Sequence, residues 1–482
     1  MRFLTFLLLC IASCVSAQKM QLPGGVDRDD VSFQLINNLI VVTVLVNDVP
    51  LNFLLDSGVG PTVVLASDEL GLLRLNNTEE ARINGIGEER KVIAWKSTDN
   101  NLRLGRASSS NHTLYLVRNA DFKLGQYLGL AIHGILGSDF FSQFEVHIDY
   151  QRKRLRFYSD QSLENHCRRC ESIPTQLVGS KITIPIQIGG QQLDLALDTG
   201  NSDALWIYPS ARTQQVVVLS DTSDDALKAK PADEKQKGAA TSIDLPHNYE
   251  QHSAKNEVEV QNHFRDPVGH GGSVTNQFSQ RVRLGWGLSG YIMGEKRTIP
   301  QVRLGDDAFG PLRVSFPAPE ALPLVPDYDG LLGNEILRRY YVVIDVPAGQ
   351  VSLRPNKVFS QPFPLTEPPV QLVAGPSRKV MLTKSQIQDA MESTSNQLGY
   401  KVTVKMDAGL YSRRDVLVSY VLPDSPMALA GLQAGDRLLF INGKSAYVLP
   451  LYEINAMLMQ PGEKVKLEYA REDQITKVTL EL

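Results

Sequence analysis

An internal repeat constrains the fold of this chain more than any other feature of its sequence, because two similar segments are expected to fold alike. Residues 33–58 align without a gap on residues 175–200. Each copy shows an alternation of β-branched residues, a turn at Asn47-Asp48 or Gly189-Gly190, and then an apolar strand that enters Asp-Ser-Gly or Asp-Thr-Gly. This pattern predicts, in each copy, a β-hairpin that leads into a loop carrying an aspartate.

The repeat continues beyond the two hairpins, with further short motifs in the same order in both halves. The matching pairs are Gly85-Ile86-Gly87 with Gly285-Trp286-Gly287, Leu102-Arg103-Leu104-Gly105 with Val302-Arg303-Leu304-Gly305, Gly134-Ile135-Leu136-Gly137 with Gly330-Leu331-Leu332-Gly333, and Ile148-Asp149 with Ile344-Asp345. Chance is a poor explanation for a shared order of motifs, so the pattern indicates duplication. The sequence therefore predicts two similar lobes, at residues 31–160 and 173–354.

The second copy is longer than the first because it contains a polar segment, at roughly residues 210–276. This segment is rich in Lys, Asp, Glu, Gln and Asn, and such a composition buries little apolar surface. We therefore predict a flexible surface insert in the second lobe. The histidines of the insert match no metal-ligand spacing, so we interpret them as part of a solvated loop and predict no metal site. They are His247, His252, His263 and His270.

Asp56 and Asp198 occupy equivalent positions in the two copies, each after an apolar strand. A buried aspartate is costly unless it is paired, hydrogen-bonded or protonated. Two carboxyl groups that lie together can share one proton, and aspartic proteases are a standard example of such a pair. The ionised carboxylate can then accept a proton from water, while the protonated carboxyl group donates to a scissile carbonyl. The two residues are our candidates for a catalytic dyad that needs no cofactor.

The residues beside each aspartate fit the same hypothesis. Gly58 and Gly200 allow the backbone to turn tightly and to approach a neighbouring chain closely. The hydroxyl groups of Ser57 and Thr199 are expected to form hydrogen bonds across an axis between the lobes. Such bonds would hold the two carboxyl groups coplanar.

These loops resemble those of the pepsin and retropepsin families, which read Asp-Thr/Ser-Gly. In those families a strand with two hydrophobic residues and a glycine crosses behind each catalytic loop, and Ile135-Leu136-Gly137 and Leu331-Leu332-Gly333 match it. The resemblance covers about residues 31–354. It implies a mainly β fold with two pseudo-symmetric β-barrel lobes, more like retropepsin subunits fused in one chain than a standard pepsin. The first loop departs from the pattern, because Val59-Gly60 lacks the hydroxyl or amide often seen there.

The resemblance also implies a flap, a mobile hairpin whose backbone groups would clamp an extended substrate. The hairpins that follow Gly85-Ile86-Gly87 and Gly285-Trp286-Gly287 are the candidates. Trp95 and Tyr291 are candidates for lining the cleft, and packing in the core is the alternative for each.

The C-terminal part of the chain has a different character. Residues 355–380 are rich in proline and predict an extended linker, and residues 381–397 have helical character. Leu398-Gly399-Tyr400 resembles the carboxylate-binding loop of PDZ domains. Residues 424–443 follow the PDZ pattern of Ser-Pro, Gly-Leu, Gly-Asp and Asn-Gly closely. The resemblance implies a PDZ-like α+β domain at residues 381–482, which would bind peptide C-termini by strand addition.

Residues 1–17 are typical of a secretory signal peptide, with a charged start, an apolar run and small residues before a cleavage position. The chain is therefore predicted to be exported, with a periplasmic, extracellular or cell-envelope location. Cleavage after Ala17 would release a soluble protein, whereas the bacterial lipoprotein box that ends at Cys14 would add a lipid anchor. In an oxidising compartment, Cys167 and Cys170 are expected to form a local structural disulfide.

The overall charge limits the partners further. The formal net charge of −4 gives no reason to expect nucleic acid or an anionic membrane surface as a partner. The leading hypothesis is an aspartic endopeptidase that acts on polypeptides. One alternative is a catalytically inactive peptide-binding adaptor on the same scaffold, and another is a peptidase that its insert covers until cleavage activates it.

Overall fold

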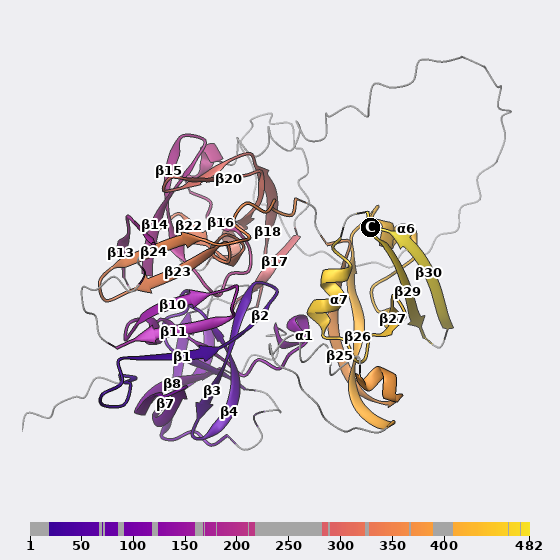
Figure 1. The fold of residues 1–482 in the computed structure, drawn as a ribbon, viewed down its shortest axis with the longest axis horizontal. Coiled ribbons are helices and arrows are strands. Elements are labelled where there is room, and N and C mark those ends of the chain that lie inside the picture. The colour runs from indigo at the N-terminus through magenta and orange to yellow at the C-terminus, as the bar shows by residue number, and fades with distance from the viewer. Residues whose placement is uncertain are drawn as a thin grey trace, which may run out of the picture.

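The computed structural model describes residues 19–66, 70, 73–84, 91–117, 124–159, 167, 169–179, 181–210, 212–216, 282–287, 290–322, 327–365, 368–388, 408–460, 462–472 and 474–482. These residues form a mainly β protein with four sheets (Figure 1). Several predicted features lie outside the described residues. They are the signal segment with Cys14, Gly85-Ile86-Gly87, the four histidines of the insert, and Leu398-Gly399-Tyr400.

The first half of the chain forms an eight-stranded sheet, in the order β2-β3-β4-β9-β5-β8-β7-β6. Its strands are β2 (Gln34–Ile36), β3 (Leu39–Val46), β4 (Val49–Leu55), β5 (Val63–Leu65), β6 (Thr78–Asn84), β7 (Lys91–Leu104), β8 (Ala107–Val117) and β9 (Gly134–Leu136), and its helices are α1 (Leu124–Leu128) and α2 (Ser138–Phe141). The predicted hairpin is confirmed as β3 and β4, and Asn47 and Asp48 form its turn with φ angles of 48° and 65°. Strand β4 ends directly before Asp56.

The second half forms a ten-stranded sheet with the same arrangement around its own aspartate. Its elements are β13 (Gln176–Val178), β14 (Lys181–Ile188), β15 (Gln191–Leu197), β16 (Leu205–Ile207), β17 (Val282–Gly287), β18 (Gly290–Ile299), β19 (Val302–Leu304), β20 (Asp307–Phe309), β21 (Leu312–Pro317), η2 (Pro319–Ala321), β22 (Gly330–Leu332) and α4 (Asn334–Leu337). Strand β15 is parallel to β22 as β4 is parallel to β9, and β16 is antiparallel to β22 as β5 is antiparallel to β9. The turn of the β14–β15 hairpin falls at Gly189 and Gly190, as predicted.

A six-stranded sheet joins the two halves, in the order β1-β11-β10-β23-β24-β12. Its strands are β1 (Arg28–Ser32), β10 (Glu145–Asp149), β11 (Arg154–Tyr158), β12 (Glu171–Ile173), β23 (Tyr340–Asp345) and β24 (Gln350–Pro355). At its centre β10 and β23 pair antiparallel, with His147 opposite Val343. Buried side chains of both halves and of this sheet belong to one continuous hydrophobic core. The two halves therefore fold as one unit.

The C-terminal residues form a separate sheet with its own core. Its elements are β25 (Val370–Leu382), β26 (Gly409–Val421), α6 (Pro426–Leu429), β27 (Arg437–Ile441), β28 (Lys444–Ser445), α7 (Leu451–Met457), β29 (Lys464–Arg471) and β30 (Gln474–Glu481). Two predictions were wrong here. Residues 370–380 belong to a strand rather than to the linker. Met381 lies in the same strand, and the predicted helix covers only residues 384–388 of the described chain. Strand β25 alternates buried and half-buried residues at its start, and this period of two is typical of a strand.

The connection between the second half and this sheet is shorter than the sequence suggested. The buried guanidinium group of Arg339 donates hydrogen bonds to the carbonyl groups of Val358, Phe359, Gln361 and Pro362. It also lies 3.6 Å from the centre of the Phe363 ring, which packs into the shared core. Residues 358–363 are therefore fixed to the second half, and residues 364–369 are what remains between them and β25.

The C-terminal sheet also contacts the first half. Helix α1 lies against β25, with α7 beside them (Figure 1). A Cβ atom added to Gly129 would lie 2.6 Å from Cβ of Leu451, and Tyr452 packs against a hydrophobic cluster of the first half. The same cluster is in contact with Val59, three residues after Asp56. The C-terminal part is therefore docked on the first half and does not stand apart from it.

Two smaller predictions concern the insert and the cysteines. Residues 210–216 were predicted as part of the polar insert, but Thr213 and Val216 are fully buried, and Thr213 bonds to the carbonyl group of Tyr208. The start of this segment therefore belongs to the folded second half. The disulfide between Cys167 and Cys170 is present, as predicted. Among the described residues, no helix has the length and apolarity needed to cross a membrane.

Candidate active site

The structure brings Asp56 and Asp198 together between the two halves. Each aspartate follows the last residue of a strand, β4 or β15. Its backbone N–H donates a hydrogen bond of 3.0 Å to a carbonyl group of the strand behind it. The acceptors are Leu136 in the first half and Leu332 in the second. These are the two strands that the sequence placed behind the loops. Both aspartates are 9% exposed.

Ser57 and Thr199 join the two loops by a reciprocal set of hydrogen bonds. The Ser57 hydroxyl donates to the Leu197 carbonyl at 2.9 Å and accepts from the Thr199 N–H at 3.1 Å. The Thr199 hydroxyl donates to the Leu55 carbonyl at 2.9 Å and accepts from the Ser57 N–H at 3.0 Å. All four bonds are buried and connect one half to the other, so they fix the distance between the aspartates.

Gly58 and Gly200 are required by the close approach of the two loops. A Cβ atom on Gly58 would lie 2.6 Å from the carboxyl carbon of Asp198. A Cβ atom on Gly200 would lie 2.2 Å from the carboxyl carbon of Asp56. Each carboxyl group therefore lies over the glycine of the opposite loop, where any side chain would displace it.

The two carboxyl groups are hydrogen-bonded to each other, and each also accepts from its own loop. Oδ1 of Asp56 accepts from the N–H groups of Gly58 at 2.7 Å and Val59 at 3.0 Å. Oδ1 of Asp198 accepts from the N–H group of Gly200 at 2.8 Å. The missing hydroxyl or amide after Gly58 therefore leaves the first loop intact, because the Val59 backbone supplies a donor.

The electrostatic environment separates the two carboxyl groups. Burial is the main cause that raises the pKa of Asp198, to about 8; the neighbouring charge of Asp56 adds to the rise, and the positive charge of Lys181 opposes it. Burial also raises the pKa of Asp56, but the positive charge of Lys181 and the two backbone donors oppose the rise. Hydrogen bonds to the charged form of a carboxylate favour that form. At neutral pH this environment favours a proton on Asp198 and a charge on Asp56.

Three residues near the dyad were not predicted from the sequence. The Lys181 ammonium donates a hydrogen bond to the Ser57 carbonyl at 2.9 Å. Burial lowers the pKa of Lys181, and the charges of Asp56 and Asp198 oppose that fall. Tyr208 and Tyr328 lie near Asp198, whose charge raises the pKa of both phenols further after burial has raised it. The repeat held a usable signal for Lys181, because the gapless alignment pairs it with an apolar residue, Leu39.

The predicted flap hairpins are described in part. Strands β6 and β7 pair antiparallel, and the segment between them, with Gly85-Ile86-Gly87, lies outside the described residues. Gly285-Trp286-Gly287 belongs to β17, which pairs with β18 from Val282 to Gly287. Trp95 is half-buried in β7 opposite Glu80 and Leu116. The side chain of Tyr291 is outside the described set.

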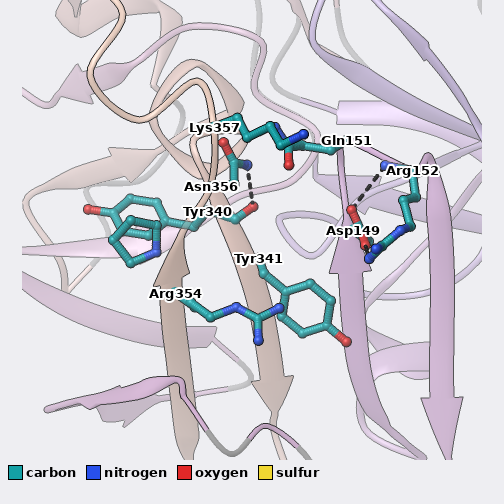
Figure 2. Close-up of a pocket in the computed structure, with 9 residues that line it drawn as sticks. Asp149, Gln151, Arg152, Tyr340, Tyr341, Arg354, Asn356 and Lys357 are labelled. Atoms are coloured by element: carbon teal, nitrogen blue, oxygen red, sulfur yellow. Dashed lines mark hydrogen bonds and ion pairs between the residues drawn. The ribbon is translucent and has the colours of Figure 1, made fainter.

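A cavity of about 390 Å³ lies on the six-stranded sheet, and neither Asp56 nor Asp198 lines it (Figure 2). Its polar groups are largely engaged with one another. Asp149 pairs with Arg152 at 3.1 Å, and the guanidinium group of Arg354 lies 4.7 Å from the centre of the Tyr341 ring. This cavity lacks the paired carboxyl groups that hydrolysis would need. Among the described residues, no group of three His, Cys, Asp or Glu side chains could hold a metal ion.

Comparison with known families supports two parts of the chain. Residues 42–140, which include Asp56, match the family model described as aspartyl protease, and residues 386–470 match the PDZ domain. The chain contains an aspartyl protease-like domain and a PDZ domain. No curated protein matches the chain. Asp198 lies outside the matched segment, so its assignment to the site depends on the geometry described above.

Proposed function

We propose that this protein is an aspartic endopeptidase with a retropepsin-like or pepsin-like dyad, Asp56 and Asp198. Two lobes within one chain, residues 31–160 and 173–354, would each supply one aspartate. The observation that carries the proposal is the reciprocal set of four hydrogen bonds between Ser57 and Thr199 and the opposite strands. These bonds support the proposal because they join the loops that carry the two buried carboxyl groups, and a pure peptide-binding protein gains nothing from such a costly arrangement.

The different environments of the two carboxyl groups suggest their roles. Asp56, with two backbone donors and the nearby ammonium group, is the carboxylate that would accept a proton from the attacking water. Asp198, with its pKa raised to about 8, would hold the proton that is donated to the scissile carbonyl. The dyad is competent while it holds one proton in total. We therefore expect activity to fall above about pH 8, where Asp198 loses that proton.

The PDZ domain would bind peptides next to this site. A PDZ domain adds an extended peptide to an exposed sheet edge, and the carboxylate-binding loop proposed here is Leu398-Gly399-Tyr400. The contact between α1 and β25 holds the domain near the first half. A substrate bound there would have a raised effective concentration at the cleft.

We also propose that the protein is exported, because residues 1–17 have the pattern of a secretory signal peptide. A periplasmic, extracellular or envelope location follows. The mass of the mature N-terminus would distinguish cleavage after Ala17 from lipid attachment at Cys14.

Incubation of the full chain with an unfolded protein substrate, over a range of pH, tests the peptidase directly. We expect internal cleavage products in the mass spectrum, inhibition by a statine-type transition-state mimic, and no effect of a metal chelator. Absence of cleavage by the folded chain at every pH would reject the proposal. Peptide binding without cleavage would then favour the adaptor.

A further inference from the structure

Lys181 breaks the symmetry of the two halves at the dyad. It is the first residue of β14, and the repeat pairs it with Leu39, the first residue of β3. Leu39 is 5% exposed and packs in the hydrophobic cluster of the first half. Lys181 is half-buried, and its side chain leaves its own half to reach the loop that carries Asp56. A lysine in place of a core leucine needs a local reason, because a partly desolvated ammonium is costly.

The contact of Lys181 leads to Asp56 through one peptide group. The ammonium donates to the carbonyl of Ser57 at 2.9 Å, and that carbonyl shares its peptide group with the N–H of Gly58. The Gly58 N–H in turn donates to Oδ1 of Asp56 at 2.7 Å. Hydrogen bonds in a chain polarise one another, so a cation at the carbonyl makes the N–H a stronger donor. The effect favours the ionised form of Asp56.

Other charged and titratable groups near the dyad do not replace this effect. The charges of Asp56 and Asp198 act on the pKa of Lys181. The charge of Asp198 also acts on the pKa values of Tyr208 and Tyr328. Burial raises the pKa of Tyr328 to about 12 and that of Tyr208 well above its usual value, so both phenols stay neutral in the working range. Of the groups that act on Asp56, Lys181 is the cation.

We propose that Lys181 is a positioning residue of the dyad, which holds the Asp56 loop through the Ser57–Gly58 peptide group and favours the ionised carboxylate of Asp56. This inference rests on the proposed peptidase function. On this account Lys181, in the second half, controls the charge of Asp56, in the first half. Lys181 also opposes the rise in the pKa of Asp198, but its hydrogen bond is to the Asp56 loop, and the counterpart position in the first half is Leu39, which carries no charge.

The pH profile of kcat/KM for a short peptide tests the proposal. In Lys181→Met we expect the acid limb to move to higher pH by about one unit, the low end of the effect that a nearby opposite charge has on a carboxyl pKa. On the acid side of the profile this shift equals about a tenfold loss. Lys181→Arg should keep the limb near its wild-type position, since it retains the cation. The matched control is Lys477→Met, which removes an exposed lysine paired with Glu468 in the PDZ domain.

The outcomes separate this proposal from the peptidase proposal. An equal loss at every pH in Lys181→Met, with the acid limb unmoved, would show that Lys181 only packs, and would overturn the inference while the peptidase stands. If wild-type protein cleaves nothing, the peptidase proposal fails, and carbon NMR titration of the aspartate carboxyl groups still tests Lys181. In that titration the first ionisation of the dyad should move to higher pH in Lys181→Met. An unmoved ionisation would reject the inference.

Discussion

The loops of Asp56 and Asp198 share one hydrogen-bond skeleton but differ in what surrounds them. In both loops a hydroxyl crosses to the opposite half and a glycine lies under the opposite carboxyl group. Asp56, however, accepts two backbone N–H groups and has Lys181 beside its loop, whereas Asp198 accepts one and has two phenols near it. The comparison teaches that the symmetric bonds set the positions of the carboxyl groups and the asymmetric surroundings set their protonation.

The two halves also differ at their outer surfaces. The first half packs α1 and its hydrophobic cluster against the PDZ domain, through Leu451 and Tyr452. The second half is tied through Arg339 to the start of the linker. Each half is therefore in contact with a different part of the C-terminal chain.

Apart from substitution of the aspartates themselves, the largest effect on activity is expected from the two glycines. Gly58→Ala and Gly200→Ala each place a methyl group against the opposite carboxyl group, so one loop must move. We expect kcat to fall by about 100-fold or more, because small displacements of catalytic groups have effects of that size. Gly200→Ala should be the more severe, since its Cβ would lie closer to the carboxyl carbon, at 2.2 Å against 2.6 Å. Peptide hydrolysis measures both. Near-normal activity in either variant would show that the carboxyl groups are not held as described.

The hydroxyl groups test the symmetric part of the comparison. Ser57→Ala leaves the Leu197 carbonyl and the Thr199 N–H without their partners, and Thr199→Val does the same to the Leu55 carbonyl and the Ser57 N–H. Each buried unsatisfied group costs about 1–3 kcal/mol, so each variant, which leaves two such groups, should lose about 2–6 kcal/mol of unfolding free energy.

The denaturant midpoint checks this prediction, with Ser419→Ala as the control. The Ser419 hydroxyl makes an exposed hydrogen bond to the Gln371 carbonyl, and its loss should have little effect. A large loss of unfolding free energy in only one of the two loop variants would show that the hydrogen bonds of Ser57 and Thr199 do not support the two loops equally.

The pH dependence of stability tests the asymmetric part. The pKa of Asp198 is raised in the folded state to about 8, so folded protein holds a proton that unfolded protein releases above about pH 4. The unfolding free energy should therefore fall as pH rises from about 4 to about 8, by at most about 1.4 kcal/mol per pH unit from this group. Asp198→Asn should flatten the curve in this window. An identical slope in both proteins would place the shared proton elsewhere.

The smallest effect is expected at the contact with the PDZ domain. Tyr452→Ala removes a half-buried ring from the cluster of the first half, and we expect a loss of about 1–2 kcal/mol, less than for a fully buried aromatic residue. Activity on a short peptide should fall slightly, because the same cluster contacts Val59. Tyr420→Ala, at an exposed ring of the same domain, is the control. Equal stability of the two variants would mean that the contact does not support the first half.

The sequence predicted the parts of the site that the repeat encodes. Asp56, Asp198, their glycines and their hydroxyls appear twice in matching order, and local strand and turn patterns place them at the ends of hairpins. The repeat marks Lys181 only as a difference between the copies, and its contact could not be predicted because the loop it reaches is more than 100 positions away in the chain. Residues 370–380 were misread because the prolines before them suggested a longer linker, although Val370, Leu372 and Ala374 are buried in alternation. The docking of Tyr452 has no local pattern, since it depends on tertiary contact.

The central claim is that Asp56 and Asp198 act as one unit, and a double-mutant cycle of kcat/KM tests it most directly. Asp56→Asn and Asp198→Asn should each reduce peptide hydrolysis by about 1,000-fold or more, because neither amide can share the proton of the pair. The double variant should be no worse than either single variant, since the first substitution already removes the function of both residues. A double variant whose loss equals the product of the single losses, or a single variant that keeps full activity, would contradict the account.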